Sequence, residues 1–302
     1  MRVRLLNAGV MLAAGVALGG AAWGGPALGD TIAALKQGGA LKLGYRVDAP
    51  PFSRALSDAE LQERKARSGA EVAPAIGFSI DLCQRAAAAV RAATRPDLPV
   101  EFVPVTVEDR FESLESGRID LLCGATTFTL QRQRRFDFSL FTFVTSASLL
   151  HRKGKVPRGF YGEVVGVIDK STSLATLRAQ AAQFEPPIKI MPVASHEAGL
   201  AALRDGRIDS YFGDRVLLRQ FAVDNKDEFS LSRLRLSNEP YALPVRKGDG
   251  ELLFAVNRAL SGSYASEEIF EIFRKWFPGA RPDASLGQLY GVMAVPEGSG
   301  LD

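Results

Sequence analysis

The chain has 302 residues, of which 37 are Lys or Arg and 34 are Asp or Glu, and its formal net charge is +3. An apolar content of 46% and a charged content of 24% are typical of a globular protein, and the length is enough for two ordinary domains. So small a charge provides no concentrated basic face, so we expect no nucleic-acid partner.

The N-terminus has the pattern of a secretory signal peptide. Two arginines precede the uncharged residues 5–28, and the small residues Ala27 and Gly29 occupy positions −3 and −1 before Asp30. We therefore predict that residues 1–29 are a cleaved signal peptide and that the mature protein is exported. The alternative is an uncleaved membrane anchor, for which the stretch is long enough, although its many Gly and Ala would make the anchor weak.

Strands and helices alternate along the first part of the mature chain. The charged segment 57–67 predicts an exposed helix inside an insert, 53–76, whose role the sequence does not indicate. The other predictions, in chain order, are a helix at 31–37, a strand at 41–45, a helix from 77 to 94, a strand at 100–105 and a helix at 108–116.

Two long strand-like runs, 138–150 and 238–246, divide the rest of the chain, and strands of that length often pass between domains. Between them we predict strands at 162–168, 189–193 and 207–212, with a helix from Leu174. After them we predict helical residues 251–276 and an irregular tail from Pro278. The resulting domain prediction is lobe 1 at 30–142, lobe 2 at 143–241, and a return to lobe 1 with the C-terminal tail at 242–302.

A duplicated segment indicates that the two lobes are alike. Residues 114–124 recur as 203–213 at a constant offset of 89 positions, as the pairs Leu114 and Leu203, Gly117 and Gly206, Asp120 and Asp209, and Gly124 and Gly213 illustrate. Each copy predicts a last helical turn, a left-handed Gly and a short apolar strand. Open α/β sheets bind ligands outside the carboxyl ends of their strands, so two such lobes would share one cleft.

Polar residues gather at the predicted strand ends. An Arg fork suits a carboxylate, hydroxyls fill further positions and an Asp can neutralise an ammonium, which together suit a free α-amino acid. Ordinary helix capping would account equally well for the two hydroxyl residues at the start of the helix after 162–168. The set is Arg46, Thr127, Arg132, Ser171, Thr172 and Asp214.

The chain lacks a Walker loop, a dinucleotide Gly-rich turn and a nucleophile elbow, so we predict neither catalysis nor a cofactor. His151 and His196 are expected to face solvent. The chain has two cysteines, Cys83 and Cys123. An even number of cysteines in an exported chain predicts a disulfide, and two buried free thiols are the alternative. Two cysteines without clustered histidines make no zinc site, so no metal is expected.

Five segments resemble the family 3 extracellular solute-binding proteins of ABC transporters. This resemblance runs in order through nearly the whole mature chain. It implies the two-lobed type II periplasmic-binding-protein fold of the α/β class with two hinge strands and a location in the periplasm. It also implies an amino acid as ligand, an ABC permease as membrane partner and a monomer. The segments are 41–52, 77–82, 124–139, 239–248 and 270–277.

The resemblance also implies roles for single residues. Arg132 would bind the ligand α-carboxylate, helped by Thr127, Ser171 and Thr172, and Asp214 would bind the α-ammonium group.

Three further positions, compared with the family pattern, bear on how the rest of the ligand would be bound. Ala125 offers only its backbone where many members have Ser or Thr, and Pro50 replaces an aromatic that stacks on the ligand, so Tyr45 or Phe52 would have to substitute. Arg46 matches the position that reads the ligand side chain, and members similar to glutamate/aspartate binders carry an Arg there. A cation there favours Glu or Asp over basic ligands; if Arg46 turns outward, a neutral polar amino acid is expected.

Two other functions compete with import. Some proteins of this fold act as dehydratases of prephenate-like acids; they need a general acid in a cleft that binds no ammonium, and Asp214 argues against this. A ligand sensor that signals to a membrane receptor would need the same cleft, and the sequence does not separate it from an importer subunit.

Overall fold

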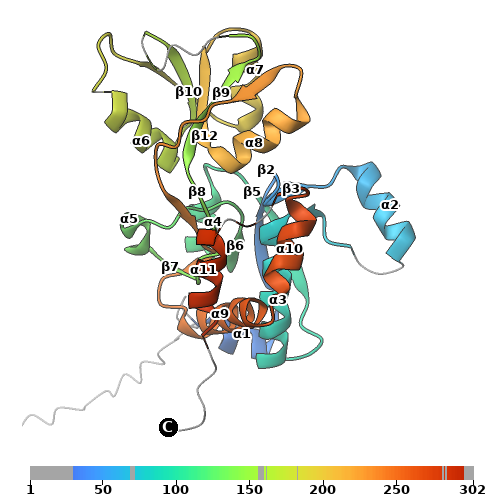
Figure 1. Cartoon of the computed structure of the whole chain (residues 1–302). Helices are drawn as coiled ribbons and strands as arrows, with labels where there is room; N and C mark the ends of the chain where they lie inside the picture. Colours follow the sequence, from blue (N-terminus) through green and yellow to red (C-terminus); the bar gives the residue numbers. More distant parts are fainter. Residues whose placement is uncertain are drawn as a thin grey trace, which may run out of the picture.

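The computed structural model describes residues 30–68, 72–155, 160, 162–181, 183–280, 282 and 284–295, so the predicted signal peptide lies outside the described residues. Two lobes, each with its own five-stranded sheet, are joined by a pair of short strands (Figure 1). This is the two-lobed α/β architecture expected from the sequence. Within the described ranges, no helix has both the length and the apolar character needed to span a membrane.

Lobe 1 contains a mixed sheet whose strands are β1 (Leu41–Arg46), β5 (Val100–Val105), β6 (Leu121–Cys123), β7 (Phe136–Phe138) and β15 (Pro244–Arg246). Their order is β5-β1-β6-β15-β7. β1 pairs in parallel with β5 and β6, whereas β15 is antiparallel to β6 and β7. The carboxyl ends of β1, β5 and β6 therefore lie at one edge, which faces lobe 2.

The helices of lobe 1 are α1 (Thr31–Gln37), α3 (Phe78–Ala93), α4 (Arg110–Glu115), α5 (Leu130–Gln133), α9 (Gly250–Ala265), α10 (Glu268–Trp276) and α11 (Ala284–Met293). α3 buries Phe78, Leu82, Ala86 and Val90, which recur every fourth residue and form one apolar face. This face packs on the sheet and on α9.

The C-terminal segment differs from the prediction. The tail from Pro278 is not irregular throughout, because α11 forms and buries Leu286, Tyr290 and Met293 at helical spacing. The Tyr290 hydroxyl donates a hydrogen bond to the carbonyl of Thr142, 2.8 Å away. The predicted helical run 251–276 is two helices, because Glu267 takes a left-handed conformation (φ 61°) between α9 and α10.

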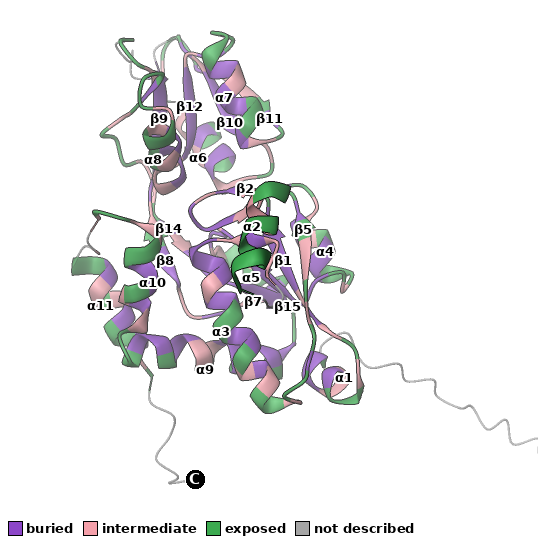
Figure 2. Ribbon diagram, turned by 90° about the vertical axis from the view of Figure 1, so that its right-hand side faces the viewer, coloured by how far each residue is buried: buried purple, intermediate pink, exposed green. Residues whose placement is uncertain are grey.

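Lobe 2 contains β9 (Ala147–Arg152), β10 (Val164–Ile168), β11 (Lys189–Val193), β12 (Ser210–Asp214) and β13 (Phe229–Leu231), in the order β11-β10-β12-β9-β13. β10 is parallel to β11 and β12, and β9 is antiparallel to β12 and β13. The helices are α6 (Thr172–Ala181), α7 (His196–Arg204) and α8 (Arg215–Asp224). Figure 2 shows the buried strands β9, β10 and β12 within this lobe.

The duplication appears in the packing of both lobes. β5-β1-β6 in lobe 1 corresponds to β11-β10-β12 in lobe 2. Gly44 on β1 and Gly166 on β10 leave room for the side chains of Ile119 and Ile208, which are themselves 89 positions apart. A Cβ atom added at Gly44 or Gly166 would lie 2.4 or 2.5 Å from the Cδ1 atom of that isoleucine. Both copies therefore need a glycine on the central strand.

The two lobes are connected by β8 (Phe143–Thr145) and β14 (Glu239–Tyr241), which pair antiparallel. The two long runs of the sequence are therefore interrupted: the first contributes the end of β7, then β8 and β9, and the second contributes β14 and β15. Each interruption separates a hinge strand from the sheet strand next to it.

A small sheet and an exposed helix make up the insert. The strands are β2 (Asp48–Ala49), β3 (Ser53–Ala55) and β4 (Ala75–Ile76), and the helix is α2 (Asp58–Ser68). α2 has no buried residue and projects from lobe 1, which confirms the predicted exposed helix (Figures 1 and 2). Glu60 accepts from the N–H of Ser57 (2.9 Å) and pairs with Arg54 (2.6 Å), which fixes the start of the helix.

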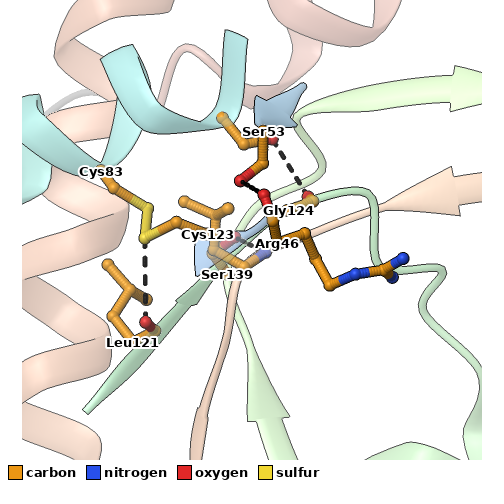
Figure 3. Close-up of a disulfide and its surroundings, with 9 residues drawn as sticks. Arg46, Ser53, Cys83, Leu121, Cys123, Gly124 and Ser139 are labelled. Carbon is orange, nitrogen blue, oxygen red and sulfur yellow. Dashed lines mark hydrogen bonds between the residues drawn. A yellow bond between two sulfur atoms is a disulfide. The ribbon is translucent and has the colours of Figure 1, made fainter. Parts of the chain in front are cut away.

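Cys83 on α3 and Cys123 on β6 form a disulfide, as predicted (Figure 3). Their sulfur atoms are 2.13 Å apart. The Ser79 hydroxyl donates to the carbonyl of Gly124 (3.0 Å), which is the next residue after the bridge. Helix α3 thus fixes the end of β6, where the chain turns toward lobe 2.

Candidate functional site

A cavity lies between the lobes at the carboxyl ends of the parallel strands. Seven of the eight residues predicted to bind ligand line it: Arg46, Ala125, Thr127, Arg132, Ser171, Thr172 and Asp214. The cavity is also lined by Arg110 and His196, which the sequence analysis did not select.

Phe52 is the predicted site residue that does not line the cavity. Its side chain is fully buried, and its ring lies edge-on to Phe78, Phe143 and Tyr241, with centroids 5.8, 5.0 and 5.1 Å away. Tyr45 does not line the cavity either. Neither ring is placed to stack on a ligand. Phe52 instead packs against Phe143 and Tyr241, which belong to the two strands that connect the lobes.

Arg132 lies on α5, whose first turn is capped by Thr129. Its Nη1 donates to the carbonyl of Thr127 (2.7 Å), and its guanidinium carbon lies 5.0 Å from the centroid of Phe111. Burial lowers the pKa of Arg132, while the charges of Asp214 and Glu239 oppose that shift. Its fork forms no ion pair with a carboxylate in the described part of the chain, so it can receive one from a ligand.

Arg46, at the end of β1, is already paired. Its Nε and Nη2 donate to the same oxygen of Asp48, at 3.0 and 2.5 Å. Burial alone would raise the pKa of Asp48, but the charges of Arg46 and His196 and hydrogen bonds from both residues lower it overall. Arg46 therefore lines the cavity as the buried half of an ion pair with the half-buried Asp48, rather than as an unbalanced cation.

Arg110, the first residue of α4, brings a third guanidinium to the cavity. It is buried, its Nη2 donates to the carbonyl of Lys170 in lobe 2 (3.4 Å), and its guanidinium carbon lies 4.5 Å from the centroid of Phe111. Burial lowers the pKa of Arg110, and the charges of Arg46 and Arg132 lower it further. Among described residues it has no carboxylate ion-pair partner, so a ligand anion would relieve this repulsion.

The prediction that the histidines face solvent is wrong. His196 begins α7 and is 7% exposed, and its Nδ1 lies 2.8 Å from the Tyr211 hydroxyl. Burial is the main reason that the pKa of His196 falls to about 4, so the ring is neutral at pH 7. His151 is buried on β9 and does not line the cavity.

Asp214 ends β12. It accepts hydrogen bonds from the hydroxyls of Ser173 (3.0 Å) and Tyr241. Burial, followed by the charge of Glu239, raises the pKa of Asp214 to about 6, although those two hydrogen bonds and the charge of Arg132 oppose the shift. The Asp214 carboxylate is ionised at neutral pH, but its burial makes the ionised form less favourable than it is in water. A bound cation would offset this cost in free energy.

The hydroxyls of Thr127 and Thr172 have a shared partner. Both donate to the same Oε2 atom of Glu239, at 2.8 and 2.9 Å. A hydroxyl has one proton, so in this arrangement each offers only lone pairs to a ligand. A ligand carboxylate would then rely on Arg132 and on main-chain N–H groups.

Ser171 acts as a helix cap. Its hydroxyl donates to the carbonyl of Ile168 (2.6 Å) and accepts from the N–H of Leu174 (3.0 Å). The Ser171 hydroxyl therefore caps the start of α6, which is the alternative that the sequence left open.

A simple signal could have found two of the missed residues. Arg110 and His196 each begin the helix that follows a parallel strand, β5 and β11, so both occupy the kind of strand-end position from which the other site residues were chosen. Glu239 lies in a hinge strand and does not itself line the cavity, and no sequence feature indicates that its side chain contacts Thr127 and Thr172.

The comparison with known families agrees with this geometry. Residues 67–279, more than two thirds of the chain, match the bacterial extracellular solute-binding proteins, family 3. The chain belongs to this family. Its fold, two α/β lobes with a cavity at the strand ends, is that of a type II periplasmic binding protein.

The solute-binding protein is similar to characterised relatives over most of its length. It is 29% identical to the L-glutamate/L-aspartate-binding protein of Pseudomonas aeruginosa, covering 86% of this chain and 83% of the relative. It is 26% identical to the glutamate/aspartate import solute-binding protein of Salmonella typhimurium, covering 94% and 91%. It also resembles the structure of an ancestral arginine-binding protein bound to arginine, with 26% identity, a TM-score of 0.67 and coverage of 79% and 98%.

Proposed function

We propose that this solute-binding protein binds an acidic amino acid, L-glutamate or L-aspartate, between its lobes and delivers it to the permease of an ABC importer. The observation that carries the proposal is the charge pattern of the cavity: Arg110 and Arg132 have no carboxylate partner among the described residues, and Asp214 lies with them. Two cations and one anion complement the two carboxylates and one ammonium of such a ligand.

Each charged group of the ligand would have a partner. Arg132 would hold the α-carboxylate, Asp214 the α-ammonium group, and Arg110, beside the Arg46–Asp48 pair, the side-chain carboxylate. A buried charge is tolerated only when it is paired. A Lys or Arg ligand would place its cation against Arg110 and leave both like charges unpaired, so basic amino acids should be excluded.

The named relatives support this ligand class but do not decide it. Two of them are named for glutamate and aspartate, whereas the ancestral structure holds arginine at comparable identity. The fold therefore accommodates opposite side-chain charges. The choice between them must come from the cavity, and the cavity of this chain contains arginines.

A thermal-shift screen of the mature chain against the amino acids tests the proposal. A ligand that binds only the folded state raises the melting temperature, so L-glutamate or L-aspartate should give the largest shift. Arg110→Ala should abolish that shift, whereas Arg118→Ala, an exposed arginine on the same lobe, should retain it. A largest shift with a basic or aliphatic amino acid would reject an acidic ligand.

Export to the periplasm is part of this proposal. Residues 1–29 carry the signal-peptide pattern, and the family is extracellular. The mass of the protein recovered from the periplasm should correspond to a chain beginning at Asp30; recovery of the full-length chain in the membrane fraction would indicate an anchor instead.

One observation favours the dehydratase alternative: Asp214 has a pKa of about 6, which is suitable for a general acid. If it served that purpose, incubation with prephenate would yield an aromatic product that Asp214→Asn does not form. We expect no turnover, because we propose that Asp214, which accepts hydrogen bonds from Ser173 and Tyr241, binds the ligand ammonium group. A sensor would use the same cleft, and only its membrane partner would differ.

A further inference from the structure

Glu239 joins parts of the molecule that move relative to one another when such lobes open. Its backbone is held in the hinge, where β14 pairs with β8 and Glu239 lies opposite Thr145. Its side chain is 3% exposed and accepts from Ser237 through Oε1 (2.6 Å). The other oxygen, Oε2, accepts from Thr127 in lobe 1 and Thr172 in lobe 2.

The two hydroxyls belong to the elements that carry the ligand site. Thr127 follows the disulfide-anchored end of β6, and Thr172 begins α6. Their oxygen atoms are 3.4 Å apart, with Oε2 of Glu239 in reach of both. Opening the lobes would carry Thr172 away with lobe 2 and remove one hydrogen bond to a buried carboxylate. Such bonds are among the stronger ones in proteins, so their loss favours the closed form.

We propose that Glu239 is a closure latch: its carboxylate holds one hydroxyl from each lobe and thereby stabilises the closed form around the ligand. Glu239 is a positioning residue, because it acts on the ligand through Thr127 and Thr172. It also sets the direction of both hydroxyl protons and so leaves carboxylate recognition to Arg132. The inference rests on the proposed function only in that the trapped ligand is an amino acid.

The latch predicts a change in lobe closure that does not depend on the ligand's identity. Cysteines introduced at Glu101 on β5 and Lys189 on β11, both exposed, can carry a fluorescent pair that reports the distance between lobes. The native cysteines are fully buried in their disulfide and should not be labelled. Glu239→Gln, which replaces one acceptor oxygen by a donor, should lower the closed fraction of the ligand-free protein.

Ligand dissociation gives a second readout. With L-glutamate as the probe, Glu239→Gln should raise the dissociation rate about tenfold and change the association rate less than twofold, because the latch acts after the lobes close. Thr172→Val should have a similar effect, and the double variant should add little to either, since Glu239→Gln weakens the bond that Thr172→Val removes. Ser237→Ala removes the bond to Oε1 and the bond that the Ser237 hydroxyl accepts from the N–H of Ala147, but it leaves both bonds to Oε2. It is the matched control and should dissociate within twofold of the wild type.

Other results would overturn the latch. If Glu239→Gln keeps the wild-type closed fraction and dissociation rate while its melting temperature falls, Glu239 is only a buried structural carboxylate. If Glu239→Gln does not fold, Thr172→Val decides by the same two readouts. If the wild type binds no L-glutamate, the proposed ligand is wrong, but the ligand-free closed fraction still confirms or rejects the latch.

Discussion

Arg132 is oriented by uncharged groups, the carbonyl of Thr127 and the ring of Phe111. This arrangement fixes the guanidinium without neutralising it. The cation therefore remains available to a ligand, in contrast to Arg46, whose charge Asp48 already balances.

Removing Arg132 should cost most of the binding affinity. Arg132→Ala leaves a buried α-carboxylate without its partner, so affinity should fall by about 3 kcal/mol or more, which is more than a hundredfold. Arg132→Lys should recover only part of this, because an ammonium cannot form the paired contact. Titration calorimetry measures both; Arg135→Ala, an exposed arginine two residues beyond α5, is the control. Near wild-type affinity in Arg132→Ala would remove it from the site.

Binding should weaken below pH 6. The pKa of Asp214 is about 6, raised by burial, and only its ionised form can pair with the ligand ammonium. Affinity should therefore be constant above about pH 7 and fall by about tenfold per pH unit below pH 6. The low pKa of His196, about 4, keeps that ring neutral across this range. Calorimetry from pH 5 to 8 tests this; a flat profile would contradict it, and Asp214→Asn should bind weakly at every pH.

The residues missed by sequence reasoning differ in kind. Arg110 and His196 occupy strand-end positions that sequence periodicity can locate, but their burial depends on tertiary packing that periodicity does not describe. The direction of the Glu239 side chain is set by three hydroxyl donors, and two of them, Thr127 and Thr172, come from distant segments that only the folded chain brings together.

At the scale of elements, the duplicated unit was predictable because the same residue types make the same contacts in both lobes. Asp120 exchanges hydrogen bonds with the backbone of Lys42: its N–H donates to the carbonyl (2.8 Å) and its carboxylate accepts from the N–H (2.9 Å). Asp209 and Val164 repeat this at 2.8 and 3.0 Å. The repeated Asp therefore fixes the start of β6 to β1 in lobe 1 and the start of β12 to β10 in lobe 2.

The hinge was harder to predict than the repeat. Residues 138–150 and 238–246 have continuous strand character, yet each is divided where the chain leaves one sheet and pairs with the other hinge strand. Tertiary pairing, rather than the local β preference of these residues, decides where such a run is interrupted. At α11 the prediction failed in the opposite direction. Its apolar residues have helical spacing, but the nearby Gly and Pro residues led to the prediction of an irregular tail.

The disulfide should contribute to the stability of lobe 1. Cys83 and Cys123 are 40 positions apart, and a bridge closing a loop of that size stabilises a fold by roughly 3–4 kcal/mol. The double variant Cys83→Ser, Cys123→Ser should lose about that much unfolding free energy in a urea titration. Labelling of the denatured, unreduced exported protein should find no thiol; two reactive thiols per chain would show that the bridge does not form.

At the scale of the whole molecule, the two lobes contribute complementary groups. Lobe 1 supplies the guanidiniums of Arg46, Arg110 and Arg132, and lobe 2 supplies Asp214 and the N-terminus of α6. Neither lobe alone surrounds a zwitterion with paired charges. Ligand binding and lobe closure are therefore expected to be one coupled event, as in other hinged two-lobed proteins.

The most direct test of the acidic-ligand site is calorimetric titration of the mature protein with L-glutamate and L-glutamine, repeated with Arg110→Ala. We predict 1:1 binding of L-glutamate to the wild type and weaker binding of L-glutamine by roughly 1.5–3 kcal/mol, the worth of a charged hydrogen bond. Arg110→Ala should lose most of this preference, because only the acid leaves a buried charge unpaired. Equal or tighter binding of L-glutamine or L-arginine by the wild type would contradict the proposed site.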